Sequence, residues 1–299
     1  MKRILTILLT LLVTALALCQ IPVMAEPVSA EDAFDTPAVV ATAAATEKAA
    51  PVSAAASQEE DAKTKISAVG AWLNTTFADF DYKVFTLFSK LHRDWLTPVI
   101  HYLTMLGDSP FVPVLLVFAI IMFMWKKNRR WAMALFFAII IGTLVTNVIV
   151  KPLIARPRPY VSLANDQQFM QWYMEAGAEV ESDKSFPSGH TTAAFEIGIT
   201  LMLAVRNKGI KWLFPLYSIF IACTRLYLCV HYCTDVIGGM LIGICAGVLA
   251  YCISRSLMSW MEESEGGLGR RLNDFDLGGK RKKKIQAEPL EADAEPLEE

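Results

Sequence analysis

Three short clusters of charged, imidazole and small polar residues stand where apolar segments of the chain end or begin. Their members are Lys151 and Arg158; Ser188, Gly189 and His190; and Arg225, His231 and Asp235. Guanidinium and ammonium groups bind phosphate oxygens, and imidazole acts as a nucleophile or a general acid near neutral pH. These residue types predict a phosphate site at a membrane edge, provided that the fold brings the three clusters together.

The first cluster follows an apolar segment and contains two arginines that each precede a proline. Proline pushes the preceding residue toward extended geometry, so the stretch from Lys151 to Pro159 is predicted to be stiff and to hold guanidinium groups at a fixed place. Taken alone, the same pattern also fits a positive cap whose side chains reach lipid headgroups, especially for Arg156.

The second cluster opens a predicted helix, and Ser188 is a residue type that favours the N-cap position. Helix geometry would point the free backbone N–H groups of Gly189 and His190 at an anion, with the positive end of the helix dipole behind them. His190 would stand within reach of a leaving oxygen. The alternative is an ordinary capped helix with a surface histidine.

The third cluster places His231 and Asp235 four residues apart at the start of a predicted helix, and therefore on one face. The carboxylate would accept a hydrogen bond from one ring nitrogen and leave the other free and nucleophilic. Arg225 would add a third cation to the phosphate site. A purely structural hydrogen bond is the alternative. No metal site is expected, because no second carboxylate stands at ligand spacing.

The composition predicts that membrane helices carry these clusters. Of the 299 residues, 54% are hydrophobic and only 19% are charged, which is too apolar for a soluble globular protein. The net charge of -2 and the scattered basic residues argue against nucleic-acid binding. Apolar segments that would span a bilayer are predicted at 111–125, 131–150, 191–205, 212–230 and 236–254.

Four regions are predicted along the chain. Residues 1–25 form a secretory signal peptide or an uncleaved first span, and residues 26–65 form a disordered extracytoplasmic linker. Residues 66–255 form the membrane domain, which begins with an interfacial amphipathic helix over residues 70–107. Residues 256–299 form a disordered cytoplasmic tail. The predicted fold is an all-α, polytopic membrane bundle of about six transmembrane helices, or five after cleavage.

Loop charges predict the orientation without reference to the clusters. The connectors 126–130 and 206–211 and the tail are basic, which favours the cytoplasm, whereas the loop 160–186 is acidic and is predicted to lie outside. Counting spans from these loops puts all three clusters on the extracytoplasmic face. In the last span, the four-residue spacing of Gly239, Gly243 and Gly247 suits close helix packing. The role of Glu196, inside the span 191–205, stays open.

The order and spacing of the clusters resemble the signature of the type 2 phosphatidic acid phosphatase family, which is related to class A acid phosphatases and vanadium haloperoxidases. The resemblance covers residues 66–255 and rests on Lys151, six residues, Arg158-Pro159; Pro187-Ser188-Gly189-His190; and Arg225, five residues, His231, three residues, Asp235. Thr224 and Cys233 stand where the family usually has serine and proline. Neither departure removes a charge or an imidazole.

The resemblance implies metal-independent phosphoryl transfer from a lipid phosphate such as undecaprenyl diphosphate, phosphatidic acid or phosphatidylglycerophosphate. His231 would be the nucleophile, oriented by Asp235, and His190 would protonate the leaving oxygen. The phosphate would be held by Lys151, Arg158, Ser188, Gly189 and Arg225. No cofactor is expected. The lipid and the oligomeric state stay open, and a lipid-linked phosphotransferase or an anion transporter are the rival functions.

Overall fold

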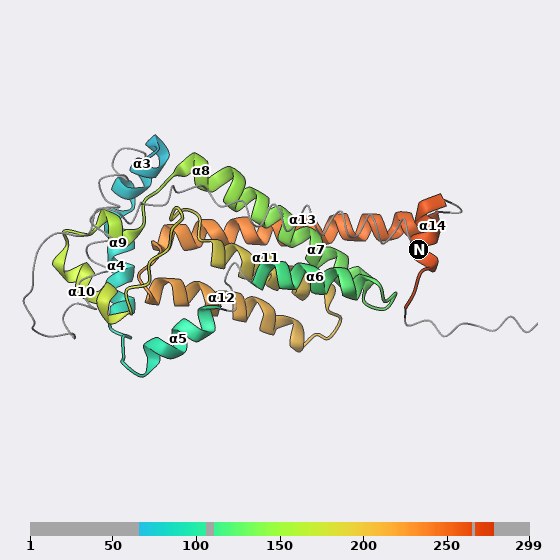
Figure 1. Ribbon diagram of the computed structural model, residues 1–299, viewed down its shortest axis with the longest axis horizontal. Helices are drawn as coiled ribbons and strands as arrows, with labels where there is room; N and C mark the ends of the chain where they lie inside the picture. Colours follow the sequence, from blue (N-terminus) through green and yellow to red (C-terminus); the bar gives the residue numbers. More distant parts are fainter. Residues whose placement is uncertain (1–65, 106–110, 265–266, 278–299) are drawn as a thin grey trace, which may run out of the picture.

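Helices are the only regular elements in residues 66–105, 111–264 and 267–277, which the computed structural model describes (Figure 1). The all-α prediction is therefore confirmed for this part of the chain. The predicted signal peptide or first span, the predicted linker and residues 278–299 of the predicted tail lie outside the described residues.

The core is a set of helices that lie side by side along the long axis of the molecule (Figure 1). They are α6 (Phe111–Phe123), α7 (Arg129–Thr143), α11 (Gly189–Ala204), α12 (Leu213–Tyr227) and α13 (Cys233–Glu263). Helix α13 packs against α7 and α11, α12 packs against α11, and α6 packs against α7. A short 3-10 turn, η3 (Ile210–Trp212), leads into α12.

Three glycines of α13 face α11, as their four-residue spacing indicates: Gly239, Gly243 and Gly247. A Cβ added at any of them would lie within 2.9 Å of a backbone carbonyl oxygen of α11 or of its N-cap residue, Ser188. A larger residue would force the two helices apart, because helices come this close only where side chains are absent. Across the same contact, the backbone N–H of Ser188 donates to the carbonyl of Asp235 at 3.1 Å.

Two helical stretches are long and apolar enough to cross a membrane. One covers residues 129–162, where α7 continues through the π-helical η2 (Leu144–Val150) into α8 (Lys151–Ile154) and, after a break, α9 (Pro159–Ser162). The other is α13, and α6 is an apolar but shorter helix. The predicted spans 111–125, 191–205 and 212–230 coincide with α6, α11 and α12. The total of six spans stays a prediction.

The prediction of one amphipathic helix over residues 70–107 is wrong. The segment forms α3 (Ala68–Thr76), α4 (Ala78–Ser89) and α5 (Leu96–Thr104), and the chain turns between Lys90 and Trp95. His92 in this turn is buried, and its Nε2 lies 2.9 Å from the carbonyl oxygen of Tyr227. This contact with the end of α12 overrides the local helical periodicity. The interfacial position of these helices stays a prediction.

The predicted disordered tail from residue 256 is wrong as far as residue 277. Helix α13 continues to Glu263, and α14 (Gly267–Asp274) follows it. The buried guanidinium of Arg129 donates to the carbonyl of Asn273 at 3.4 Å and to that of Phe275, which ties this region to the start of α7. The sequence did not predict these contacts, because Arg129 bonds to main-chain carbonyls and every residue has one.

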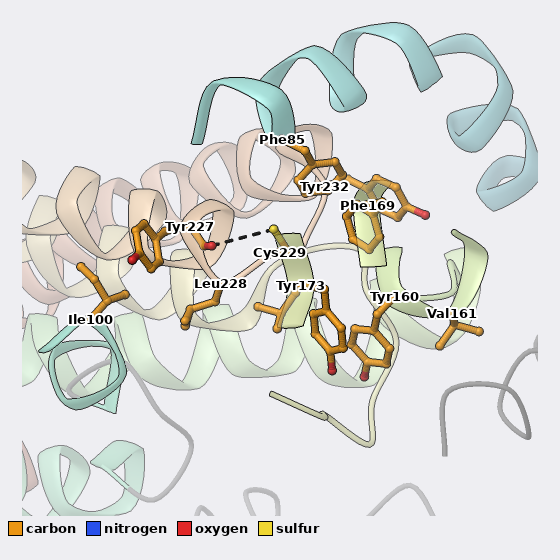
Figure 2. Packing of buried hydrophobic residues seen from close by; sticks show 11 residues of the cluster. Phe85, Ile100, Tyr160, Val161, Phe169, Tyr173, Tyr227, Leu228, Cys229 and Tyr232 are labelled. Atoms are coloured by element: carbon orange, nitrogen blue, oxygen red, sulfur yellow. Dashed lines mark hydrogen bonds between the residues drawn. The ribbon is translucent and has the colours of Figure 1, made fainter. Parts of the chain in front are cut away.

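A hydrophobic cluster packs around the segment that joins α12 to α13 (Figure 2). The end of α12 contributes the buried Tyr227, and the joining segment contributes four more buried residues on either side of His231, which are Leu228, Cys229, Val230 and Tyr232. Helix α9 and α10 (Gln167–Glu175) add Tyr160 and Tyr173, whose rings stack with their centroids 4.9 Å apart. The cluster therefore fixes the backbone on both sides of His231.

Candidate active site

The structure places the three clusters at one end of the bundle, where α8, the start of α11, the end of α12 and the start of α13 meet (Figure 1). Lys151 begins α8, and Arg158 directly precedes α9. Arg225 lies in the last turn of α12, and Asp235 lies in the first turn of α13. Gly189 is half-buried, and the other predicted site residues are buried.

His231 is 1% exposed, and its Nε2 lies 3.0 Å from Nη1 of Arg158. A guanidinium only donates hydrogen bonds, so Nε2 is the acceptor and the proton of the neutral ring sits on Nδ1. Burial, followed by the positive charges of Arg158, Arg225 and Lys151, lowers the pKa of His231 well below its ordinary value, while Asp183 opposes this shift. His231 is thus neutral, and its unprotonated Nε2 accepts a hydrogen bond from a cation.

Asp235 does not form the predicted hydrogen bond with His231. Nδ1 of His231 and Oδ2 of Asp235 are 3.6 Å apart, and Nδ1 has no hydrogen-bond partner among the described residues. The prediction placed both residues on one helix, whereas α13 begins at Cys233 and His231 lies in the segment before it. A movement of about 1 Å would bring the two atoms to hydrogen-bonding distance.

The carboxylate of Asp235 is held by three other groups. Its Oδ1 accepts a hydrogen bond from Nη1 of Arg156 at 2.6 Å. Its Oδ2 accepts from the hydroxyl of Ser185 and from the backbone N–H of Tyr232 at 3.0 Å. The carboxylate is therefore fixed in place, with Oδ2 directed toward His231 but not bonded to it.

Arg156 is fully buried, so its interpretation as a cap that reaches lipid headgroups is wrong. Its Nη2 donates to Oδ2 of Asp81 on α4 at 2.9 Å, and its guanidinium lies 3.7 Å from the ring centroid of Tyr232. The hydroxyl of Thr234 also bonds to Asp81 at 2.9 Å. Two carboxylates, those of Asp81 and Asp235, thus compensate one buried guanidinium.

Sequence reasoning missed both Arg156 and Asp81 as parts of this site. Asp81 is 1% exposed, although the periodicity of its segment assigned it to the polar face of an interfacial helix. The sequence did not distinguish Arg156 from Arg158, because each arginine precedes a proline. It also did not distinguish Asp81 from the other acidic residues of its segment.

The three predicted phosphate-binding cations meet the acidic segment, residues 179–183, which precedes α11. Glu181 contacts Nη2 of Arg158 at 2.6 Å and also contacts Nη2 of Arg225. Asp183 contacts both Lys151 and Arg158. Burial raises the pKa of Asp183, but the positive charges of Lys151 and Arg158 outweigh burial and lower this pKa overall. The sequence predicted this segment only as part of an acidic outer loop.

The start of α11 adds backbone N–H groups to the site. The hydroxyl of Ser188 accepts from the backbone N–H of Thr191 at 3.4 Å, so the predicted N-cap is present. A Cβ added to Gly189 would lie 3.4 Å from Nζ of Lys151, and the buried His190 is the next residue. The positive end of a helix and an ammonium group therefore lie together, which suits an anion with more than one charge.

Arg225 is positioned by α5, since its Nη1 donates to the hydroxyl of Thr104 at 3.0 Å. The hydroxyl of Thr224 donates to the carbonyl of Ile221 at 2.7 Å and lies 3.1 Å from that of Thr104. Thr224 stands where the family that the sequence resembles usually has serine, and its hydroxyl lies among these groups. Thr224 and Arg225 thus both contact the hydroxyl of Thr104, and Thr224 helps to position Arg225 through it.

Known proteins of similar sequence cover the same region. A lipid A 4'-phosphatase of Bacteroides thetaiotaomicron is 27% identical over 191 residues, which are 62% of this chain and 81% of that protein. An undecaprenyl-diphosphatase of Bacillus subtilis is 26% identical over 184 residues, which are 61% of this chain and 88% of that protein.

The fold is similar to that in the crystal structure of a transmembrane PAP2 type phosphatidylglycerolphosphate phosphatase from Bacillus subtilis. The TM-score is 0.51 at 23% sequence identity, over 63% of this chain and 91% of that one. Residues 131–259 match the family model of the PAP2 superfamily, and this range contains all three clusters, from Lys151 to Asp235. The segment that carries the three clusters is therefore similar to the PAP2 superfamily.

Proposed function

We propose that this chain is an integral membrane enzyme that hydrolyses a lipid phosphate or diphosphate at the extracytoplasmic face of the cytoplasmic membrane. One observation carries the proposal: the unprotonated Nε2 of the buried His231 lies 3.0 Å from Arg158, beside Lys151 and Arg225. A neutral imidazole nitrogen among fixed cations suits attack on phosphorus, because the cations stabilise the charge on the phosphate oxygens.

In the first step, the substrate phosphate takes over the hydrogen bond that Arg158 donates to Nε2 of His231. Nε2 then attacks phosphorus, and the nitrogen–phosphorus bond forms as the bond from phosphorus to the oxygen of the lipid or of the lipid phosphate breaks. His190 gives its proton to the departing oxygen. Lys151, Arg158 and Arg225, with the hydroxyl of Ser188 and the N–H of Gly189, hold the phosphate oxygens. The proton on Nδ1 of His231 stays on the ring and approaches Asp235 as the ring becomes positively charged.

In the second step, water attacks the phosphohistidine and gives its proton to His190. The bond between Nε2 and phosphorus breaks, and inorganic phosphate leaves. His190 and His231 thereby return to their starting protonation states. The transferred group is stabilised by charge and position alone, as in other phosphoryl transfers, and the protein supplies that charge through its own cations.

The surroundings of the site support a lipid substrate. Two helices long and apolar enough to cross a membrane reach this end of the bundle, so a substrate that arrives from the bilayer would present its headgroup here. The relatives are phosphatases of lipid A and of undecaprenyl diphosphate, which share a phosphate on a large apolar anchor. We therefore expect phosphate recognition to dominate, with undecaprenyl diphosphate, phosphatidic acid and phosphatidylglycerophosphate as the candidates.

Phosphate release in detergent from these three lipids tests the proposal. We expect no release by His231→Ala and a fall of about 10²- to 10⁴-fold for His190→Ala, which removes the general acid. EDTA should leave the wild-type rate unchanged. Full activity of His231→Ala, or complete loss of activity with EDTA, would refute the mechanism. Transport without phosphate release would favour an anion transporter instead.

A further inference from the structure

We infer that Glu181 and Asp183 determine the anion specificity of the site as internal ligands, whose carboxylates occupy the phosphate positions until a substrate phosphate displaces them. The inference rests on the proposed function, because it concerns the same three cations. It adds two residues that lie between the first and second clusters of the signature.

The contacts of the two carboxylates follow the pattern expected of phosphate oxygens. Glu181 uses one oxygen on Arg158, at 2.6 Å, and its other oxygen on Arg225. Asp183 uses one oxygen on Arg158 and the other on Lys151. Each carboxylate thus bridges two of the three cations. A phosphate bound to all three cations would use the same donor groups.

Charge balance shows why these ligands matter before substrate arrives. Lys151, Arg158 and Arg225 contribute three positive charges, and their side chains are 9% exposed or less. Buried charges without partners are strongly unfavourable. Glu181 and Asp183 contribute two negative charges, and Glu179 approaches Arg225 at 3.8 Å. The acidic segment therefore compensates the cations.

The carboxylates lie nearer to solvent than the cations beneath them. The side chain of Asp183 is 41% exposed and that of Glu181 is 19% exposed. The backbone of this segment is anchored, because the buried Tyr160 hydroxyl donates to the carbonyl of Glu181 at 2.9 Å and accepts from its N–H at 3.1 Å. Displacement therefore requires rotation of two side chains toward solvent and leaves the chain path in place.

The consequence is selection among anions. Every anion must compete with two tethered carboxylates, so a singly charged carboxylate ligand gains nothing by exchange. A phosphate that carries close to two charges and three acceptor oxygens at neutral pH replaces both internal ligands at once. The same competition weakens the binding of inorganic phosphate and speeds its release after hydrolysis.

Binding of inorganic phosphate to the purified full-length protein in detergent, followed by calorimetry, tests the inference. Glu181→Gln and Asp183→Asn keep the size of each side chain and remove its charge. We expect each to lower the Kd for inorganic phosphate by about tenfold, the effect of one lost charge-assisted competitor. Glu175→Gln is the matched control, because Glu175 lies on α10 opposite His92 and should leave the Kd unchanged.

Failure of this inference and failure of the proposed function would give different results. An unchanged or higher Kd in both Glu181→Gln and Asp183→Asn, in a wild-type protein that hydrolyses lipid phosphates, would overturn this inference alone. If inorganic phosphate bound to none of the proteins and no lipid phosphate were hydrolysed, the phosphate site itself would be wrong, and the inference with it.

Discussion

The imidazole of His231 lies between a guanidinium that it touches and a carboxylate that it does not. Nε2 accepts a hydrogen bond from Arg158, whereas Nδ1 is 3.6 Å from Asp235. Burial and nearby positive charge favour the neutral ring, and attack on phosphorus would convert it to a cation. In the proposed mechanism, Asp235 would stabilise the charge that appears on this ring, and such stabilisation lowers the barrier of the reaction.

The lowered pKa of His231 predicts how stability depends on pH. Below about pH 6.5, the histidine of the unfolded chain binds a proton, whereas the folded protein does not until the pH reaches the lower folded pKa. Stability therefore falls with decreasing pH across this window, with a slope of up to about 1.4 kcal/mol per pH unit from this residue. The thermal midpoint of the wild type should drop more between pH 7.5 and 5 than that of His231→Asn.

His101→Asn is the comparison for this measurement, since His101 contacts the carbonyl of Ala176 and Glu179 and not the three cations. Equal slopes for the wild type and His231→Asn would show that His231 titrates normally in the folded protein.

Arg156 is expected to act as a positioning residue, because it holds Asp235 and is proposed to contact no substrate atom. Arg156→Lys keeps the charge but cannot reach Asp81 and Asp235 together with planar geometry. We expect kcat to fall about 10- to 100-fold with little change in KM, because small displacements of reacting groups are costly. Steady-state kinetics of phosphate release measure this split.

Arg130→Lys is the matched substitution at an exposed arginine, which contacts the hydroxyl of Tyr251 and should leave both constants unchanged. A rise in KM with kcat intact for Arg156→Lys would mean that Arg156 binds the substrate directly.

Residue types and spacing predicted that Lys151, Arg158, Arg225 and His231 form one site, and the structure brings them together. The pairing of His231 with Asp235 was predicted at the wrong distance, because the helix begins two residues later than the pattern implied. The partners Asp81 and Glu181 were not predictable. Their roles arise from contacts between segments that lie far apart in the sequence, and one acid among several carries no local mark.

The interface of α11 with α13 connects the fold to the proposed chemistry. The glycines of α13 let its backbone touch that of α11, and the first of these contacts lies at Ser188. The same interface joins Ser188 to the carbonyl of Asp235. Helix packing therefore sets the distance between the second and third clusters.

Gly243→Ala tests this connection. Its Cβ would lie 2.6 Å from the carbonyl oxygen of Thr192, which is closer than real Cβ contacts allow. We expect a loss of about 1–3 kcal/mol of stability, typical of overpacking, and reduced activity because the start of α11 shifts. Thermal unfolding and phosphate release in detergent measure the two effects.

Gly209→Ala serves as the control, because its added Cβ would meet nothing nearer than 3.5 Å. It should match the wild type in both measurements. Wild-type stability and activity for Gly243→Ala would show that this interface does not position the site.

Hydropathy predicted the core helices α6, α7, α11, α12 and α13 because an apolar segment must satisfy its own backbone hydrogen bonds. It did not predict the division of residues 70–107 into three helices. That division depends on the burial of His92 and Asp81 against other elements, which local periodicity does not encode. Hydropathy also did not predict the π-helical η2 before Lys151.

The candidate site lies at one end of an elongated bundle, and α14 lies at the other end (Figure 1). The loop charges predict that the site end faces away from the cytoplasm. That orientation would let the enzyme act on lipids of the outer leaflet without access to cytoplasmic nucleotides or metabolites.

Labelling of single cysteines tests the orientation. In a chain without its native cysteines, Gln168→Cys lies on the exposed face of α10 near the site, and Lys208→Cys lies in the connector before α12. A membrane-impermeant maleimide should label Gln168→Cys in intact cells and Lys208→Cys only after permeabilisation. The reverse pattern would place the site in the cytoplasm and contradict the loop-charge prediction.

In the proposed mechanism, His231 forms a covalent bond to phosphorus during turnover. Rapid mixing of the enzyme with a lipid phosphate labelled on phosphorus, followed by an alkaline quench that preserves phosphohistidine, measures this bond directly. The wild type should carry label on His231 that disappears as inorganic phosphate is released, and His231→Ala should carry none. Label retained by His231→Ala, or turnover by the wild type without any labelled protein, would contradict the mechanism.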